Sequence, residues 1–375
     1  MKNILITGGA GFIGTKLCDK LYDLGYTITI LDNLSPQVHP KEIKRHPKKI
    51  WKKCIFIEGD VCDKDIWKRA FKDQDLLIHL AAETGTGQSM YELSKYNNVN
   101  IMGTANMLEY LATEDHNVKK IIVASSRAIY GEGKYKCSVH GFTYPLGRVE
   151  TCIRNGDFNL KCKVCNTELQ LVGTDEKSQI NPLSIYAITK HQQEQMVMLM
   201  GKTLEIPTIS LRYQNVFGPG QSLSNPYTGI LSIFSTRLLN GNDLEIYEDG
   251  LESRDFIFIE DVVDATILCL ENSAANNQIF NVGSGKNTSV YKVAESLRDL
   301  LNPKCQIRLT GNYRLGDIRH NYADLSKIKD TVGFVPKYSF EQGISKFVSW
   351  VKNQRLEKDN YENSVKELRI KGLLK

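Results

Sequence analysis

Short apolar runs alternate with segments of helical spacing through the first half of the chain. The apolar runs span 2–7, 27–32, 54–60, 75–82 and 119–126, and helical patterns span 11–24, roughly 63–72 and 89–113. Runs of this length are typical of buried strands, and strands separated by helices are typical of parallel sheets. The pattern therefore predicts an α/β fold with a doubly wound parallel sheet.

The second half of the chain has a looser pattern. A helical segment around 185–203 precedes the strand-like TISLRYQNVFG, and shorter strands and helices follow to about residue 352. The segment SVKELRIKGLL near the end has the spacing of a short amphipathic helix. We therefore expect a second, smaller α/β lobe, followed by a helical tail over 353–375.

The composition is that of an ordinary globular protein. The 375 residues are 41% hydrophobic and 24% charged, with a net charge of +5, so no nucleic-acid partner is indicated. A dense basic run at 39–53 is more typical of a solvated loop than of a phosphate-binding surface. No apolar run reaches the roughly 18–20 residues of a membrane span, and Gly8 interrupts the first run too early for a signal peptide. We expect a cytoplasmic protein with no membrane partner, whose nine cysteines are reduced.

A glycine-rich turn joins the first strand to the first helix. In GGAGFIG, Gly8, Gly11 and Gly14 allow backbone N–H groups and the helix N-terminus to approach a pyrophosphate. Asp32 ends the next strand, eighteen residues after Gly14, where a carboxylate binds ribose hydroxyls and repels a 2′-phosphate. We therefore expect residues 1–180 to form a Rossmann-type NAD-binding domain, and 181–352 to complete it and form the second lobe.

Tyr186 and Lys190 form a Y-x-x-x-K pair in the segment YAITK. Residues i and i+4 share a helix face, so the ammonium can lie near the phenolate. A free tyrosine titrates near pH 10, and a base that works near neutrality needs a shift of about 3 units, or about 4 kcal/mol. The lysine and an oxidised nicotinamide, both cationic, act in that direction.

Several further segments, taken with the glycine steps, resemble the extended short-chain dehydrogenase/reductases, that is, the NAD-dependent epimerase/dehydratase family. They are Asp60-Val61, His79-Leu80-Ala81-Ala82 and Asn100-x-x-Gly103, and the resemblance covers nearly the whole chain apart from 133–175. The family's fold is the Rossmann sheet with a smaller C-terminal substrate lobe. The resemblance implies that NAD contacts Gly8, Gly11, Phe12, Ile13, Gly14, Asp32, Asn33, Asp60, Val61, Leu80, Ala81, Ala82, Asn100, Ser125, Tyr186, Lys190 and Tyr213.

The same resemblance implies the catalytic and substrate-binding residues. Ser126 would hydrogen-bond the reacting sugar oxygen, beside Tyr186 and Lys190, although Ser125 and Ser126 also suit strand-end capping. Arginine suits the substrate diphosphate because its fork donates two hydrogen bonds. In related 4,6-dehydratases an Asp-Glu pair follows the serine, and Arg127-Ala128 stands there in this chain, which disfavours dehydration. The implied substrate contacts are Thr86, Ser126, Arg127, Asn215, Arg254 and Arg319, with His320 as a further candidate.

Within the family, long segments such as HLAAETGTGQSMYE and GNYRLGDIRHNYADLSKIK resemble dTDP-L-rhamnose 4-epimerases and similar nucleotide-sugar epimerases. This implies that Tyr186 takes the proton of the 4-hydroxyl while C4 gives hydride to NAD, and that the 4-keto sugar turns over and takes it back. It also implies a homodimer, since relatives pair through two helices per subunit. Three alternatives are a nucleotide-4-ketosugar reductase, an epimerase of a GDP-, UDP- or CDP-sugar at C2 or C4, and an NAD-sensing scaffold protein.

The segment 133–175 holds two Cys/His doublets, Cys137-x-x-His140 and Cys162-x-x-Cys165, with 21 residues between them. Paired doublets are typical of zinc ribbons, and a closed set of four ligands indicates a structural rather than a catalytic metal. Free thiols and a redox or catalytic metal role are the alternatives, and Cys152 is an alternative fourth ligand to His140. We expect the zinc to order the insertion as a lid or wall beside the sugar pocket.

Overall fold

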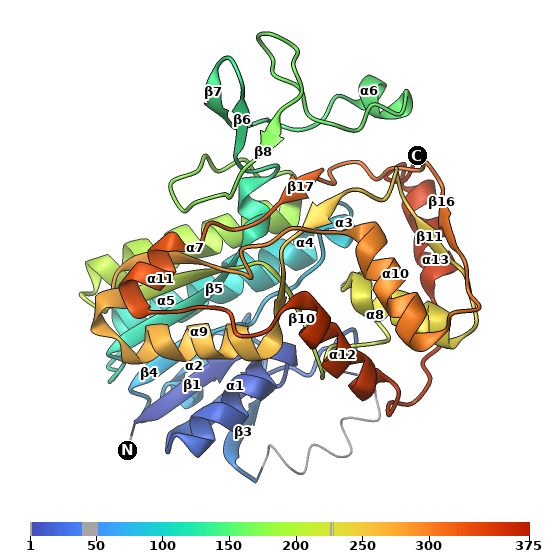
Figure 1. Ribbon diagram of the computed structural model, residues 1–375. Helices are drawn as coiled ribbons and strands as arrows, with labels where there is room; N and C mark the ends of the chain where they lie inside the picture. Colours follow the sequence, from blue (N-terminus) through green and yellow to red (C-terminus); the bar gives the residue numbers. More distant parts are fainter. Residues whose placement is uncertain (1, 40–51, 226, 228) are drawn as a thin grey trace.

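The computed structural model describes residues 2–39, 52–225, 227 and 229–375 (Figure 1). Most of the basic run at 39–53 lies outside the described residues. The central sheet has seven parallel strands in the order β14-β9-β5-β4-β1-β2-β3. This order confirms the doubly wound sheet, which β9 and β14 complete from the second half of the chain. The strands are β1 (Asn3–Thr7), β2 (Thr27–Asp32), β3 (Cys54–Glu58), β4 (Leu76–His79), β5 (Lys120–Ser126), β9 (Thr208–Tyr213) and β14 (Gln278–Val282).

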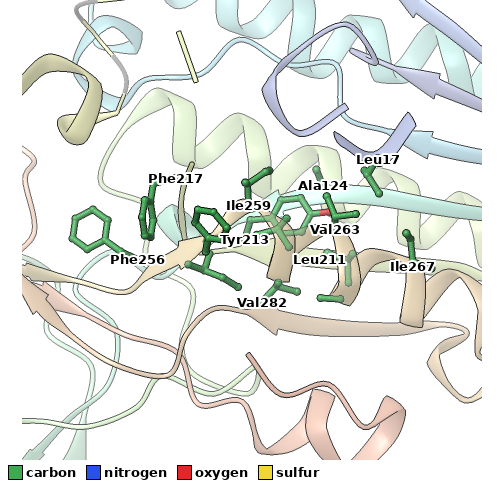
Figure 2. Close-up of a cluster of buried hydrophobic side chains, with 14 of the residues drawn as sticks. Leu17, Ala124, Leu211, Tyr213, Phe217, Phe256, Ile259, Val263, Ile267 and Val282 are labelled. Atoms are coloured by element: carbon green, nitrogen blue, oxygen red, sulfur yellow. The ribbon is translucent and has the colours of Figure 1, made fainter. Parts of the chain in front are cut away.

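Helices cover both faces of the sheet because its strands are apolar on both sides. Successive side chains of a strand point to opposite faces. Ile4 and Ile6 of β1 join one buried cluster, which contains Leu17, and Leu5 joins the other, which contains Trp67. Figure 2 shows part of the first cluster, in which side chains of β9 and α9 meet. Among the helices that contribute to the first cluster are α1 (Phe12–Asp23) and α9 (Ile259–Glu271), and among those of the second are α2 (Ile66–Ala70), α5 (Gly103–Thr113) and α7 (Ile185–Thr203).

The helical pattern at 89–113 is interrupted in the structure. It forms α3 (Thr86–Ser89), α4 (Leu93–Tyr96) and a π-helical turn, η2 (Asn97–Met102), that continues into α5. At the start of α5 the chain passes close to Val61, since a Cβ on Gly103 would lie 2.5 Å from Val61 Cγ2. Inside the π turn, the Asn100 side chain bonds the backbone of Glu83. Such turns inside helices are frequent at functional sites.

The second lobe is built from short strands and four helices beside the sheet. Parallel pairs join β10 (Asn215–Phe217) to β13 (Phe256–Phe258) and β11 (Leu244–Ile246) to β16 (Ile307–Leu309), while β12 (Ser253–Arg254) lies between β15 (Thr288–Ser289) and β17 (His320–Asn321). The helices are α8 (Ile230–Leu239), α10 (Val290–Leu301), α12 (Phe340–Val351) and α13 (Tyr361–Ile370), and the remaining elements are η4 (Ser273–Ala275) and α11 (Ser326–Val332). The predicted amphipathic tail is α13, whose apolar face packs on Tyr91 and Tyr247.

The Cys/His insertion projects from the top of the sheet in Figure 1. It follows η3 (Arg127–Tyr130) and contains a three-stranded antiparallel sheet of β6 (Tyr135–Cys137), β7 (Gly141–Thr143) and β8 (Gln170–Leu171), together with α6 (Glu150–Arg154). Its small core consists of Tyr135, Cys137, Leu160, Cys162 and Leu169. Among the described residues of the whole chain, none of the helices combines the length and apolarity required to cross a bilayer.

Candidate active site

A single large cavity runs along the carboxyl ends of the sheet strands and into the second lobe. Its volume is about 1150 Å³, more than the few hundred to 1,000 Å³ of most single-ligand pockets. In doubly wound sheets, ligands bind at this edge. The cavity wall includes predicted cofactor residues and predicted substrate residues, among them Gly8, Asp32, Ala81, Ser126, Tyr186, Asn215 and Arg254.

The glycine turn closes at distances that only glycine tolerates. Gly8 has a φ of +67°, and a Cβ there would lie 2.8 Å from the backbone nitrogen of Ala81. A Cβ on Gly14 would lie 2.6 Å from the Gly8 carbonyl oxygen. The first turn of α1 therefore approaches β1 closely, and Phe12, Ile13 and Gly14 line the cavity. This is the cradle that a pyrophosphate requires.

Asp32 lies at the end of β2 and opens onto the cavity, with 8% of its surface exposed. Its carboxylate accepts hydrogen bonds from the N–H groups of Ala10 (3.1 Å) and Leu34 (2.9 Å), which oppose the rise in pKa that burial causes. His39 Nε2 lies 3.7 Å away, a neighbour that the sequence motif did not indicate. The glycine cradle and this acidic residue together fit the pyrophosphate and ribose of a dinucleotide.

Four predicted cofactor residues lie outside the cavity lining: Lys190, which is described below, and Asp60, Asn100 and Ser125. The Asp60 carboxylate accepts from Asn33 Nδ2 (2.9 Å) and the Cys62 N–H (2.9 Å). Asn100 bonds the N–H and carbonyl of Glu83, and Ser125 is buried. The predicted residues that do line the cavity, besides those already placed, are Gly11, Asn33, Val61, Leu80, Ala82 and Tyr213.

Ser126 and Tyr186 meet at the cavity wall from two different elements. Ser126 ends β5, where its Oγ accepts a hydrogen bond from the N–H of Ala128 (3.2 Å). Tyr186 stands in the first turn of α7, which begins there because the Ser184 hydroxyl accepts from the N–H of Ala187 (3.1 Å). Burial raises the pKa of Tyr186, while its hydrogen bond with Ser126 and the positive charge of Arg127 act to lower it.

Lys190 lies one turn beyond Tyr186 but points elsewhere. Its side chain is buried outside the cavity lining, and its ammonium donates to Gln193 Oε1. Gln193 in turn donates to Thr104 Oγ1 (2.8 Å), which lies 3.0 Å from His79 Nε2. Burial lowers the pKa of Lys190 to about 7. The expected contact between this ammonium and the tyrosine is therefore not made here, because a buried polar network binds the lysine.

Arg254 holds its own place by hydrogen bonds to backbone carbonyls. Its guanidinium donates to the carbonyls of Ile318 (2.7 Å) and Arg319 (3.0 Å), and it lines the cavity together with Asn215 on β10. Thr86 at the start of α3 and Arg127 in η3 also line the cavity, as predicted. Burial and the nearby charge of Arg254 lower the pKa of Arg127 to about 9.

Arg319, the other predicted substrate arginine, is turned away from the cavity. It is 1% exposed, and its two terminal nitrogens donate to the two carboxylate oxygens of Asp249, each at 2.7 Å. His320 is also outside the lining, and its Nδ1 lies 2.9 Å from Ser253 Oγ. The prediction of a substrate contact for Arg319 is therefore corrected, because a buried ion pair occupies its guanidinium.

The sequence reasoning missed Arg314 and Asp317, which both line the cavity. Arg314 Nε donates to Asp317 Oδ2 (2.9 Å), and the positive charges of Arg314 and Arg254 keep the pKa of Asp317 low although partial desolvation acts to raise it. The R-x-x-D spacing within GNYRLGDIRH was the signal that could have indicated this pair. The tail helix was predicted, but its place at the cavity was not: Tyr361, Ser364 and Leu368 of α13 line the cavity.

The four predicted metal ligands converge in the insertion. Their Sγ and imidazole nitrogen atoms all lie within 4.8 Å of one another, and Cys152 is not part of the cluster. Cys137 Sγ lies 3.5 Å from Cys165 Sγ and 3.5 Å from His140 Nδ1, and it accepts from the N–H of Val139 (3.4 Å). The donor set of three thiols and one imidazole suits zinc.

The insertion does not form the expected wall of the sugar pocket. No described residue of 133–175 is part of the cavity lining. The insertion instead packs behind residues 313–320, through contacts such as Tyr135 OH to the His320 carbonyl (3.3 Å). The prediction of a lid or wall is therefore wrong, because this stretch of chain stands between the insertion and the cavity.

Comparison with known proteins gives one family match and several relatives that cover most of the chain. Residues 4–146 and 166–283 match the NAD dependent epimerase/dehydratase family. The dTDP-L-rhamnose 4-epimerase of Burkholderia thailandensis is 35% identical over 364 residues, which cover 96% of this chain and 97% of that protein. The putative UDP-glucose 4-epimerase of Methanocaldococcus jannaschii is 31% identical over 93% of this chain and 98% of its own length.

Solved structures agree with these sequence matches. The UDP-N-acetylglucosamine 4-epimerase from Methanobrevibacter ruminantium is 30% identical, with a TM-score of 0.75 over 94% of this chain and 99% of that chain. The family match ends at residue 283, and its internal gap, residues 147–165, lies within the Cys/His insertion. The glycine cradle, the acidic end of β2 and the extent of these matches agree: the chain belongs to the NAD dependent epimerase/dehydratase family.

Proposed function

We propose that this protein is a nucleotide-sugar epimerase that inverts C4 of a hexose with resident NAD. One observation carries the proposal. A single cavity is lined by the Ser126–Tyr186 pair, by the glycine turn with Asp32, and by Arg254 and Arg314. Such a reaction needs three parts in one space: a base, a dinucleotide site and a diphosphate-binding site.

The cofactor would be held by the glycine turn and Asp32, with Tyr213 and the Ser126–Tyr186 pair along the same wall. Bound NAD supplies the acceptor and donor of hydride at the sugar carbon. The carboxylate of Asp32 favours NAD over NADP because a 2′-phosphate there would meet a buried negative charge.

The chain's own residues move the proton and hold the substrate. Tyr186 takes the proton of the 4-hydroxyl and returns it after inversion, and Ser126 hydrogen-bonds the same oxygen. Arg254, Arg314 and Asn215 hold the nucleotide diphosphate while the 4-keto sugar turns beside Thr86. By the family resemblance, Arg127-Ala128 replaces the Asp-Glu pair of the related 4,6-dehydratases, so water loss lacks the carboxyl groups that would serve as its acid and base.

The proposed substrate pair is dTDP-L-rhamnose and dTDP-6-deoxy-L-talose. The support is the 35% identity to a dTDP-L-rhamnose 4-epimerase over nearly the full chain. Purified protein should be incubated with a panel of dTDP-, UDP-, GDP- and CDP-sugars, without added cofactor, and followed by proton NMR. A new C4 stereoisomer formed without added NAD is the expected result. Turnover that consumes one reduced cofactor per product would instead identify a ketosugar reductase, and no turnover would contradict the proposal.

We also propose that Cys137, His140, Cys162 and Cys165 bind a structural zinc ion. Zinc bonds of about 2.3 Å to sulfur and about 2.0 Å to nitrogen set tetrahedral ligands about 3.5–3.8 Å apart, and the two distances from Cys137 Sγ are 3.5 Å. Metal analysis of the purified protein should find one zinc per chain. The variant Cys162→Ser should lose it and Cys152→Ser should keep it, and a zinc-free wild type would refute the site.

A homodimer and a cytoplasmic location stay predictions. The exposed side chains of Met102, Ile188 and Leu199, on η2 and α7, support pairing through these helices. The oligomeric state in solution can be measured by light scattering, with Leu199→Lys expected to weaken the dimer.

A further inference from the structure

Residues 313–319, here called the substrate loop, carry Arg314 and Asp317 to the cavity. The loop has no helix or strand of its own. Its first residues are held by an antiparallel bridge between Arg314 and Leu374, and other parts of the chain must fix the path of residues 316–319. On one side it faces the cavity and Arg254, and on the other it contacts the Cys/His insertion. The side chain that joins the insertion to the loop most directly is Arg148.

Arg148 is a buried arginine with two acceptors. Its side chain is 4% exposed, and Nη2 donates to the backbone carbonyl of Asp317 (2.8 Å). Nη1 donates to Glu248 Oε2 (2.6 Å), which keeps the guanidinium in place. Glu132 Oε1 lies 3.7 Å from its Nε. A buried charge is tolerated only when it is paired and hydrogen-bonded, so this geometry is strongly specified.

Arg148 and Arg254 donate hydrogen bonds to neighbouring carbonyls of the loop. Arg254 donates to the carbonyls of residues 318 and 319, and Arg148 donates to the carbonyl of residue 317. Two arginine side chains therefore bind three consecutive carbonyls. One of them lines the cavity and the other does not. The loop is also anchored by Glu132, whose Oε2 accepts from the Arg319 N–H (2.8 Å).

The insertion makes a second contact at the other end of the loop. The Tyr313 hydroxyl donates to Glu150 Oε1 (3.2 Å) and accepts from Arg154 Nε (3.1 Å). Glu150 and Arg154 are the ends of α6, which follows Arg148 in the chain. The insertion thus contacts the loop on both sides of Arg314.

We propose that Arg148 is a positioning residue for substrate binding: it fixes the carbonyl of Asp317, and with it the Arg314–Asp317 pair, at the cavity. Through Arg148 the insertion acts on nucleotide-sugar affinity without contacting the substrate. This inference rests on the proposed function. The contacts that carry it do not include the metal cluster, and they would hold whichever hexose the protein accepts.

The test compares Arg148→Met and Arg148→Lys with Lys136→Met, which removes an exposed charge from the same insertion. In Arg148→Met the KM for the nucleotide sugar and the Kd for its nucleoside diphosphate should rise about 10- to 100-fold, as expected for loss of a hydrogen bond to a charged donor. The kcat, bound NAD and bound metal should stay within about 3-fold of wild type. Arg148→Lys should recover part of the loss, and Lys136→Met should behave as wild type.

Glu248→Gln covers the case in which Arg148→Met does not fold. It removes the charge that holds Arg148 and should raise KM by a smaller factor in the same direction. Unchanged KM and Kd in Arg148→Met or, if that variant does not fold, in both Arg148→Lys and Glu248→Gln would overturn the inference and leave the proposed function intact. Equal losses of kcat, NAD and substrate affinity would do the same. A wild type that binds no nucleoside diphosphate or nucleotide sugar would overturn both.

Discussion

The two walls of the cavity are built in different ways. The cofactor wall is mainly backbone, from the turn after β1 and the ends of β2 and β4. Glycine allows this close approach because a Cβ on Gly8 would lie only 2.8 Å from the Ala81 nitrogen. The substrate wall is made of charged side chains from distant segments, with Arg127, Arg254, Arg314 and Asp317 all lining the cavity. The first wall depends on local turn geometry, and the second depends on ion pairs and carbonyl contacts between distant segments.

Because the two walls are built differently, defects in them should have different effects on binding and turnover. A defect in the backbone cradle removes the site for the dinucleotide, and chemistry stops with it. A defect in the charged wall leaves the dinucleotide and the base in place and weakens the hold on the substrate. Because buried ion pairs depend on one another, the loss of one arginine also disturbs its neighbours.

The largest effect is expected where the two walls meet. Tyr186→Phe removes the hydroxyl that is proposed to take the proton, so kcat should fall by about 10²- to 10⁴-fold. Bound NAD should remain, since the glycine cradle is untouched. Tyr110→Phe on α5, which is outside the cavity lining, is the control and should keep normal turnover. Full activity in Tyr186→Phe, measured by NMR, would show that Tyr186 is not the base.

The cofactor wall should lose its NAD when a side chain is added at its tightest point, Gly8. Gly8→Ala places a Cβ 2.8 Å from the Ala81 nitrogen at a φ of +67°, so the purified protein should lose most of its NAD. Gly25→Ala is a matched control, because Gly25 also has positive φ (+85°) but has nothing within 4 Å of its Cβ position. Absorbance of the released cofactor measures the difference, and equal NAD content in both variants would contradict a steric cradle.

A change in the substrate wall should raise the KM for the nucleotide sugar. Arg314→Met removes one guanidinium from the cavity and leaves Asp317 without its partner, so KM should rise about 10- to 100-fold with little change in kcat. Arg308→Met, at an exposed arginine paired with Asp243, is the control and should leave KM unchanged. If kcat fell and KM stayed constant, Arg314 would act in the chemical step and the separation of the walls would be wrong.

A smaller effect is expected on the pH profile. Burial raises the pKa of Tyr186 and the charge of Arg127 lowers it. In Arg127→Met the phenolate loses that charge, so its pKa rises and less of it is ionised at a given pH. The acid limb of kcat against pH, measured with saturating sugar, should move upward by about one unit. An unchanged limb, or one that moves downward, would show that Arg127 does not act on the tyrosine.

The cofactor wall was easier to predict from the sequence than the substrate wall, because the first depends on local turns and the second on contacts between distant segments. The sheet, Gly8, Gly14 and Asp32 were predictable because turn geometry depends on a few neighbouring residues. Arg314 and Arg319 lie five residues apart in one segment, and only the position of Asp249, distant in the chain, decides that Arg319 is turned inward. The direction of Lys190 and the place of the insertion also depend on partners far away in the sequence, and no local pattern reports them.

The central claim is that inversion proceeds by removal and return of hydride at one carbon. A nucleotide sugar deuterated at C4 should therefore be incubated with the wild type in ordinary water, without added cofactor, and its product examined by NMR and mass spectrometry. The account predicts that the inverted product keeps the deuterium at C4. Loss of the label to solvent would contradict it, since the carbon would then exchange a proton and not a hydride.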